Sequence, residues 1–265
     1  MDVGRLAIWL VFLTAIFVPL ERLCALHPAK IWRKQIGVDL AWYFINSLFP
    51  AAILSVPLAL VAQTPFVLVV NPELPVHSIA ELIQYAKQQA GKLSYATAGV
   101  GTPHHLFAEL LKSMTGIDMS PVGYRGSLPA LNDVIAGHVP LMFVDLGPAL
   151  GIIQAGKVRP LGVSTRTRLA VIPDVPPLAD VGVPGFDAAS WQMIVAPAKT
   201  PRPIVDQLHD ELKALVGSAE IKDRILEEGM VPMDDRSVAD LHAFVVSEIA
   251  RWGKVVRQAG LEGSQ

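Results

Sequence analysis

Short β-rich runs that alternate with helix-like segments constrain the fold of this chain more than any other feature. Between residues 65 and 164 each run ends at turn residues, and patterns of helical period separate one run from the next. Parallel strands need a crossover connection of a dozen or more residues, usually a helix. The alternation therefore predicts an α/β domain built from parallel βαβ units.

The expected elements follow one another along the chain, with strands and helices in turn. The strands are Pro65–Pro72, Leu93–Thr97, Met119–Tyr124, Val139–Asp145 and Arg159–Ser164, and the helices between them are Ser78–Gln89, Thr102–Met114, Ser127–Gly137 and Gly147–Ala155. A proline- and glycine-rich loop follows, and then one strand and three helices: Ser190–Ala198, Pro203–Val216, Ala219–Glu228 and Val238–Gln258.

The first 62 residues differ from the rest, because they hold two uncharged apolar stretches, Leu6–Leu20 and Leu40–Ala62. The second is long enough to cross a bilayer core, which takes about 20 apolar residues. The segment between them is basic, so it is expected to stay in the cytoplasm. The sequence predicts a transmembrane hairpin over 1–62 that tethers the remainder to the periplasmic side of the bacterial inner membrane. A signal peptide or an artefact of the gene is the alternative.

Composition and motifs exclude several classes of function. The formal net charge of -2 over 265 residues argues against a nucleic-acid-binding protein, which needs a basic face. The chain lacks a Gly-x-Ser-x-Gly elbow and a phosphate loop, and its seven histidines do not have the spacing of a metal site. We expect no enzyme activity, no cofactor and no metal.

Three segments that leave predicted strands carry groups suited to an acid. Ligands of open α/β sheets bind beyond the carboxyl ends of the strands. The glycine-rich loop Thr97–Thr102 opens a helix there, and its N–H groups favour an anion. Arg125 adds a guanidinium after the next strand, and Asp145 ends a third strand at the same edge. The site would hold a small carboxylate and a nearby polar or amino group. The candidate ligand-binding residues are Thr97, Gly99, Gly101, Thr102, Arg125, Gly126 and Asp145.

Each candidate also has a purely structural interpretation. Gly99 and Gly101 could simply form a tight turn, Arg125 could be a solvated surface residue, and Asp145 could only cap the helix that follows it.

Five runs of the sequence carry a family resemblance: TPFVLVVNPELPVHSIAELIQYAK, GKLSYATAGVGTPHHLFAELLKSMTGIDM, YRGSLPALNDVIAGHVPLMF, SWQMIVAPAKTPRPIVDQLHDEL and EIARWGKVVRQAG. Over about residues 60–260 the chain resembles the Bug-type solute receptors of tripartite tricarboxylate transporters. The resemblance implies a fold like the type II periplasmic binding proteins, with two lobes that close on a small carboxylate. It also implies that the receptor delivers this ligand to a membrane permease.

The resemblance implies a division of the chain as well. Residues 63–190 match a complete second lobe, and residues 191–265 match only the carboxyl-terminal part of a truncated first lobe. The family's ligand positions fall on the seven candidate residues named above. One departure concerns Asp145, because Val144 stands where the family usually has its acid, which shifts the side chain by one position along the strand.

A second resemblance covers the start of the chain. VPLERL (18–23) and DLAWYFIN (39–46) are similar to the opening of the fatty acid hydroxylase and sterol desaturase family. That family implies two irons held by histidine boxes, which this chain lacks. A membrane hydroxylase or desaturase fragment and a non-functional chimera are therefore the alternatives to a truncated or fused receptor.

Overall fold

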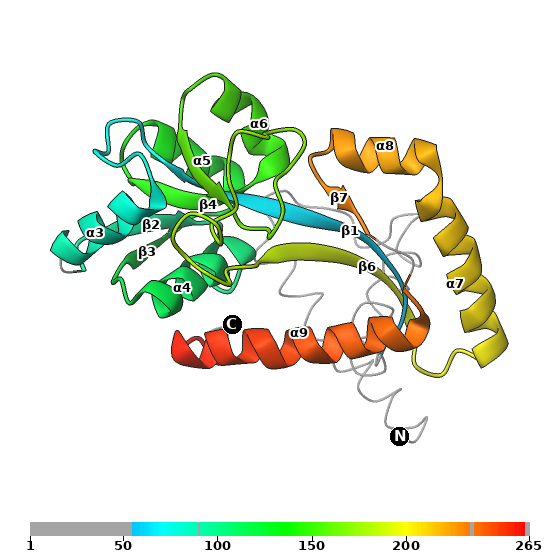
Figure 1. Ribbon diagram of the computed structural model, residues 1–265. Helices are drawn as coiled ribbons and strands as arrows, with labels where there is room; N and C mark the ends of the chain where they lie inside the picture. Colours follow the sequence, from blue (N-terminus) through cyan, green and yellow to red (C-terminus); the bar gives the residue numbers. More distant parts are fainter. Residues whose placement is uncertain (1–54, 90, 234–235, 263–265) are drawn as a thin grey trace, which may run out of the picture. The chain divides into compact units, whose positions relative to one another are not determined.

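The computed structural model describes residues 55–89, 91–233 and 236–262 (Figure 1). Most of the predicted hairpin over 1–62, and the hydroxylase-like segment within it, lies outside these residues. The part that is described, residues 55–62, belongs to strand β1 and not to a membrane helix. Among the helices of the described ranges, none combines the length and the apolar character that crossing a bilayer requires.

Strand β1 (Ser55–Val70) runs through two sheets and joins them. Its first part pairs with β6 (Ala189–Pro197), up to the partners Pro65 and Ala189. From Phe66 onward it pairs with β4 (Leu141–Asp145) and with β5 (Arg159–Val163). The apolar run after Pro65 explains this position, because its alternate side chains enter hydrophobic clusters on the two opposite faces of the sheet.

The larger sheet has the order β3-β2-β4-β1-β5. β2 (Ser94–Thr97) pairs in parallel with β3 (Ser120–Gly123) and with β4, which confirms the expected βαβ units. The expectation of parallel pairing is wrong for β1, which is antiparallel to both of its neighbours in this sheet. The reason is that β1 arrives from the part of the chain that pairs with β6, and no helix crossover precedes it. Its direction is therefore opposite to that of β4 and β5.

Helices cover both faces of this sheet. α3 (Ile79–Gln89) and α4 (Pro103–Thr115) contribute buried side chains to the cluster on one face. α5 (Ser127–Ile135) and α6 (Leu146–Gln154) contribute to the cluster on the other. The Oγ of Ser78 accepts the N–H of Glu81, as expected of a helix cap.

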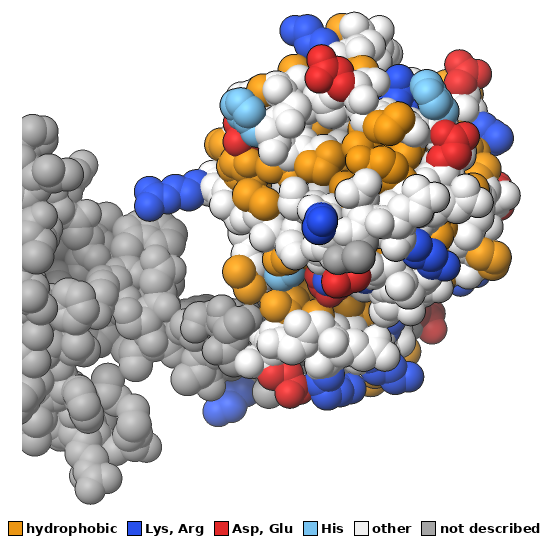
Figure 2. Space-filling view, turned by 90° about the vertical axis from the view of Figure 1, so that its left-hand side faces the viewer, with side chains coloured by type: hydrophobic (Ala, Val, Ile, Leu, Met, Phe, Trp, Pro, Cys, Tyr) orange, Lys and Arg blue, Asp and Glu red, His pale blue; other side chains and the backbone are white. Residues whose placement is uncertain are grey.

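The edge strand β3 lies at the end of the sheet that faces the viewer in Figure 2. Hydrophobic side chains gather over part of this face, and charged side chains lie mostly around them. β3 spans four residues and contains Pro121, which has no N–H to offer to a further strand. A short edge of this kind limits pairing with another chain.

The carboxyl-terminal elements surround the first part of β1. They are β6, α7 (Arg202–Gly217), α8 (Ala219–Glu227), β7 (Val231–Pro232) and α9 (Val238–Gln258). β6 and β7 both pair with β1, so the domain boundary predicted at residue 62 lies inside a continuous strand. α9 also reaches α4, where Trp252 stacks on Phe107 with 5.4 Å between ring centroids.

Candidate functional site

Side chains from three consecutive strand-to-helix connections meet at one edge of the sheet. Nε2 of His104, at the start of α4, lies 3.0 Å from Oδ1 of Asp145 and 3.1 Å from Oγ of Ser127. Ser127 begins α5, and its hydroxyl donates to the same Asp145 oxygen over 2.6 Å. We call these three residues the strand-end cluster. It joins the carboxyl ends of β2, β3 and β4, where a ligand of an α/β sheet is expected.

The hydrogen bonds fix the protonation pattern of the strand-end cluster. Both neighbours of His104 Nε2 accept, since the Ser127 hydroxyl already donates to Asp145, so the imidazole hydrogen is assigned to Nε2. Burial raises the pKa of Asp145, but the hydrogen bonds from His104, Ser127 and the backbone of Asp145 itself lower it by more. The net pKa lies below its ordinary value, and the carboxylate is ionised at neutral pH.

The same three residue types form catalytic triads, but this arrangement differs from one. In a triad the imidazole bridges the serine and the acid through its two different nitrogens. Here Ser127 and Asp145 both contact Nε2, while Nδ1 is buried without a hydrogen-bond partner. The hydroxyl donates its hydrogen to the carboxylate and not to the imidazole, so His104 does not activate it as a nucleophile.

The Thr97–Thr102 loop has the sharp conformation expected, with φ of 131° at Gly99 and 73° at Gly101. Such angles favour glycine. The N–H groups of its two glycines, however, already have partners: that of Gly99 donates to Thr97 Oγ1 (3.0 Å) and that of Gly101 to His105 Nδ1 (3.2 Å). The N–H of Thr102 reaches the carbonyl of Gly99, and its hydroxyl donates there as well instead of capping α4. These internal bonds shape the loop.

A second network behind this loop escaped the sequence analysis. His105, which is buried, lies 3.9 Å from Oε1 of Glu109, and this oxygen accepts the Tyr95 hydroxyl (2.6 Å) and the Lys112 ammonium (2.8 Å). Burial lowers the pKa of His105; Glu109 opposes this and Lys112 adds to it, with a net decrease. His105 thus stays neutral and accepts from Gly101. The paired histidines in the first turn of a predicted helix were the available signal.

The Tyr124–Ser127 connection offers free backbone donors at the start of a helix. Gly126, with φ of 121°, is the N-cap of α5, and no acceptor among the described residues takes the N–H groups of Gly126, Ser127 or Leu128. Arg125 is exposed and makes no ion pair within the described part of the chain. Free amides therefore lie at Ser127 of the strand-end cluster, and Arg125 stands two residues before it with an exposed side chain, a combination that can hold an anion.

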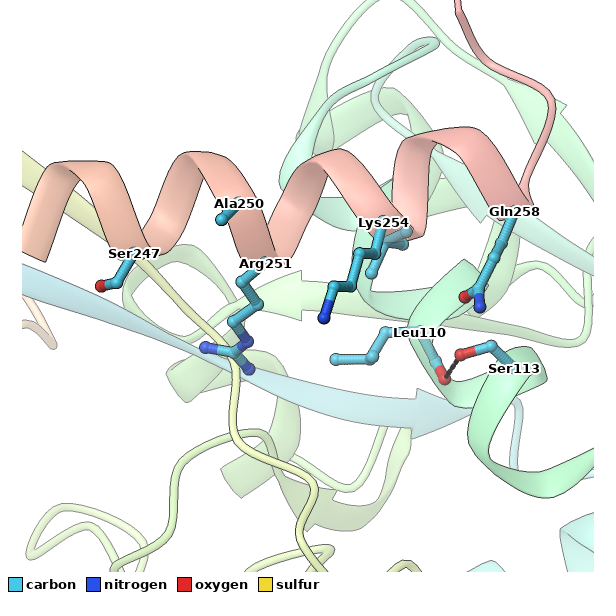
Figure 3. Close-up of a pocket in the computed structure, with 8 residues that line it drawn as sticks. Leu110, Ser113, Ser247, Ala250, Arg251, Lys254 and Gln258 are labelled. Carbon is cyan, nitrogen blue, oxygen red and sulfur yellow. Dashed lines mark hydrogen bonds between the residues drawn. The ribbon is translucent and has the colours of Figure 1, made fainter.

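A surface groove of about 480 Å³ lies elsewhere, between α4 and α9 (Figure 3). Arg251 and Lys254 extend toward it from α9, and Leu110 and Ser113 line it from α4. Arg251 is already held by Glu248 and by the carbonyl of Asp187. Along α4, the first residue that lines the groove is Leu110, which lies about two helical turns after His104. Its polar groups do not converge as those of the strand-end cluster do, so the cluster is the better candidate site.

Comparison with known proteins gives a consistent result. Residues 44–261 match the family described as the tripartite tricarboxylate transporter family receptor. Over 213 residues the chain is 34% identical to a UPF0065 protein of the tcbD-tcbE intergenic region of Pseudomonas sp., which covers 79% of this chain and 62% of that protein. Protein BugT of Bordetella pertussis is 31% identical, over 77% of this chain and 63% of its own length. The chain thus spans about three fifths of the length of these relatives.

Solved structures agree with this family. An R. palustris protein solved with adipate has 38% identity and a TM-score of 0.69, over 78% of this chain and 69% of its own. The periplasmic binding protein BugD has 29% identity and a TM-score of 0.66, over 78% and 69%. MatC from Rhodopseudomonas palustris with bound malate has 28% identity and a TM-score of 0.66, over 76% and 69%. The comparisons do not show the expected resemblance of residues 1–62 to hydroxylases.

Proposed function

Because this chain belongs to the tripartite tricarboxylate transporter receptor family, we propose that it is an extracytoplasmic solute-binding protein for small carboxylates. It would bind its ligand without turnover and without a cofactor, and pass it to the membrane permease of a tripartite transporter. The meeting of three strand ends at His104, Ser127 and Asp145, beside unpaired amides and a free guanidinium, is the observation that carries this proposal.

In this proposal the acid group of the ligand binds at the start of α5. The N–H groups of Gly126, Ser127 and Leu128 would donate hydrogen bonds to the carboxylate, and the guanidinium of Arg125, in the same connection, would balance its charge. The glycine loop would line the site through its conformation; its predicted residues are Thr97, Gly99, Gly101 and Thr102. Asp145 would contact a polar group of the ligand other than the carboxylate that binds at the start of α5.

The ligands of the relatives support this class of ligand. The R. palustris protein was solved with adipate and MatC with malate, and both ligands are dicarboxylates. The anion-binding groups at the start of α5 suit either one, since they recognise a carboxylate and not the carbon chain behind it.

We retain the predicted division into a second lobe (63–190) and the carboxyl-terminal part of a first lobe (191–265), with β1 as the strand that links them. Attachment to the membrane through residues 1–62 stays a prediction, and any span would have to end before Ser55, where β1 begins. The hydroxylase alternative would require a metal site. Among the described residues, no three His, Cys, Asp or Glu side chains lie close enough together to hold a metal ion.

Isothermal titration calorimetry of the full chain with succinate, malate, adipate and citrate tests the proposal. At least one of them should give a saturable signal. R125A should then weaken binding about tenfold or more, since a charge-assisted hydrogen bond contributes roughly 1.5–3 kcal/mol. R202A is the matched control, because this exposed arginine on α7 pairs with Asp206 and should leave the affinity unchanged. No binding by any of these acids would favour the non-functional chimera.

A further inference from the structure

We propose that the strand-end cluster selects carboxylates bearing an ammonium or hydroxyl group on the carbon next to the acid, over the unsubstituted acids. This inference rests on the proposed function and narrows its substrate class. It concerns the group that His104, Ser127 and Asp145 would contact, not the carboxylate bound at the start of α5.

The first step is that the cluster has no hydrogen-bond donor left to offer. The Ser127 hydroxyl and the His104 Nε2–H both point to Oδ1 of Asp145. The remaining nitrogen of His104, Nδ1, is buried and therefore offers no donor to a ligand. Within the described residues, no side-chain donor reaches Oδ2 of Asp145. What the cluster presents to a ligand is therefore acceptors, which match a donor group and not a second carboxylate.

The second step concerns access. The Asp145 side chain keeps 21% of its surface exposed, whereas the His104 side chain keeps 9%. The carboxylate is thus the member of the cluster that a ligand can reach. Two donors hold it in place, so little ordering is needed when a ligand binds. An ionised carboxylate in a partly desolvated site attracts an ammonium and repels another carboxylate.

The third step places the donor relative to the ligand's acid group. Ser127 contributes to both parts of the site: its backbone N–H is one of the free amides at the start of α5, and its side chain contacts Asp145. The anion-binding amides and the Asp145 carboxylate are therefore connected through the single residue Ser127 and lie close together in space. A ligand that uses both must carry its donor close to its carboxylate, as in α-amino and α-hydroxy acids.

Calorimetry with matched pairs tests the inference: succinate against aspartate, succinate against malate, and adipate against 2-aminoadipate, each titrated into the full chain. The substituted member of each pair should bind about tenfold or more tightly, as expected when a charged acceptor gains a donor. In D145N the preference should shrink or reverse, since the neutral amide attracts ammonium less and can donate to a carboxylate. D223N, an exposed aspartate on α8, should keep the wild-type preference.

The outcomes separate the two proposals. If no acid binds, the proposed function fails. If succinate and adipate bind as tightly as their substituted counterparts, the receptor function stands and the inference is overturned. It is also overturned if D145N, shown to be folded by its thermal unfolding, weakens all ligands equally. Should D145N not fold, the wild-type pairs alone decide, because the preference does not depend on any variant.

Discussion

Asn71 shows how a single buried amide can hold two elements together. Its Nδ2 donates to the carbonyls of Val134 (2.8 Å) and Ile135 (3.2 Å) at the end of α5, and its Oδ1 accepts the N–H of Glu73 (2.8 Å). Asn71→Ala should lower the free energy of unfolding by about 2–4 kcal/mol, since it removes three hydrogen bonds that each contribute about 0.5–1.5 kcal/mol. Urea denaturation measures this change.

Asn132→Ala is the control, because this exposed side chain on α5 forms no hydrogen bond to another described residue. It should change the free energy of unfolding by about 0.5 kcal/mol or less. Equal effects of the two substitutions would contradict a capping role for Asn71.

His105 should make stability depend on pH. Its pKa in the folded protein lies below the ordinary 6.5, because burial disfavours the charged imidazole. As the pH falls through 6.5, the unfolded chain binds a proton that the folded chain does not, so the free energy of unfolding decreases. A group of this kind contributes at most about 1.4 kcal/mol per pH unit. His105→Asn should remove this contribution and keep an acceptor for Gly101.

Urea denaturation of wild type and His105→Asn at pH 7.5, 6.5 and 5.5 provides the measurement. The wild-type free energy of unfolding should fall more steeply toward low pH than that of the variant. Parallel curves would show that His105 takes up its proton equally well in both states.

At this scale the sequence predicts which residue types gather at the strand ends but not how they pair. Glycines, an arginine and an aspartate after consecutive strands are visible in the sequence. The contact between His104 and Asp145 spans 41 residues, and it depends on which face of α4 turns toward β4. The amides of Gly99 and Gly101 were expected to be free, and the bonds that they donate to Thr97 and His105 depend on side-chain directions that spacing alone does not give.

Among the elements, β1 departs most from expectation. Its residues 55–62 form the end of the uncharged apolar stretch 40–62. By composition alone, such a stretch is compatible with a membrane helix and with a buried strand. Its antiparallel direction was not predictable either. The alternation of helices and strands indicates how the strands after β1 are connected, but it says nothing about the direction of β1 itself. The strands and helices from Ile79 to Val163 agree with the predicted ones, since each is bounded by clear turn residues.

Two glycines of α6 give a matched test of packing between elements. A Cβ on Gly147 would lie 2.6 Å from the carbonyl oxygen of Glu228, in the turn after α8, whereas a Cβ on Gly151 would meet nothing within 4 Å. Gly147→Ala should therefore destabilise the protein by about 1–3 kcal/mol through overpacking. Gly151→Ala should stabilise it by about 0.5–1 kcal/mol through helix propensity.

Thermal unfolding compares these two variants directly. The melting temperature should fall for Gly147→Ala and rise for Gly151→Ala. If both substitutions raised it, the close approach of α6 to the turn after α8 would be absent in solution.

Across the whole described chain, hydrophobic burial is uneven. The two clusters around β2, β4 and the end of β1 contain most of the fully buried side chains. The third cluster, among β6, α7 and α9, consists of Ala196, Val205 and Val238 with Leu212 packed against it. Several large apolar side chains of these elements remain exposed, among them Leu215 (55%) and Ile249 (68%). Local stability should follow this difference, because opening a segment with few buried contacts costs little free energy.

Hydrogen–deuterium exchange measured by mass spectrometry tests this expectation across the molecule. Peptides from α7 and α8 should exchange at least about tenfold faster than those from β4 and from the part of β1 after Pro65. α9 offers an internal comparison, since Trp252 and Val255 pack in its second half while Val246 and Ile249 are exposed. Amides of 251–256 should thus exchange more slowly than those of 244–249. Uniform protection of the carboxyl-terminal elements and the larger sheet would mean that both unfold as one cooperative unit, in spite of their unequal cores.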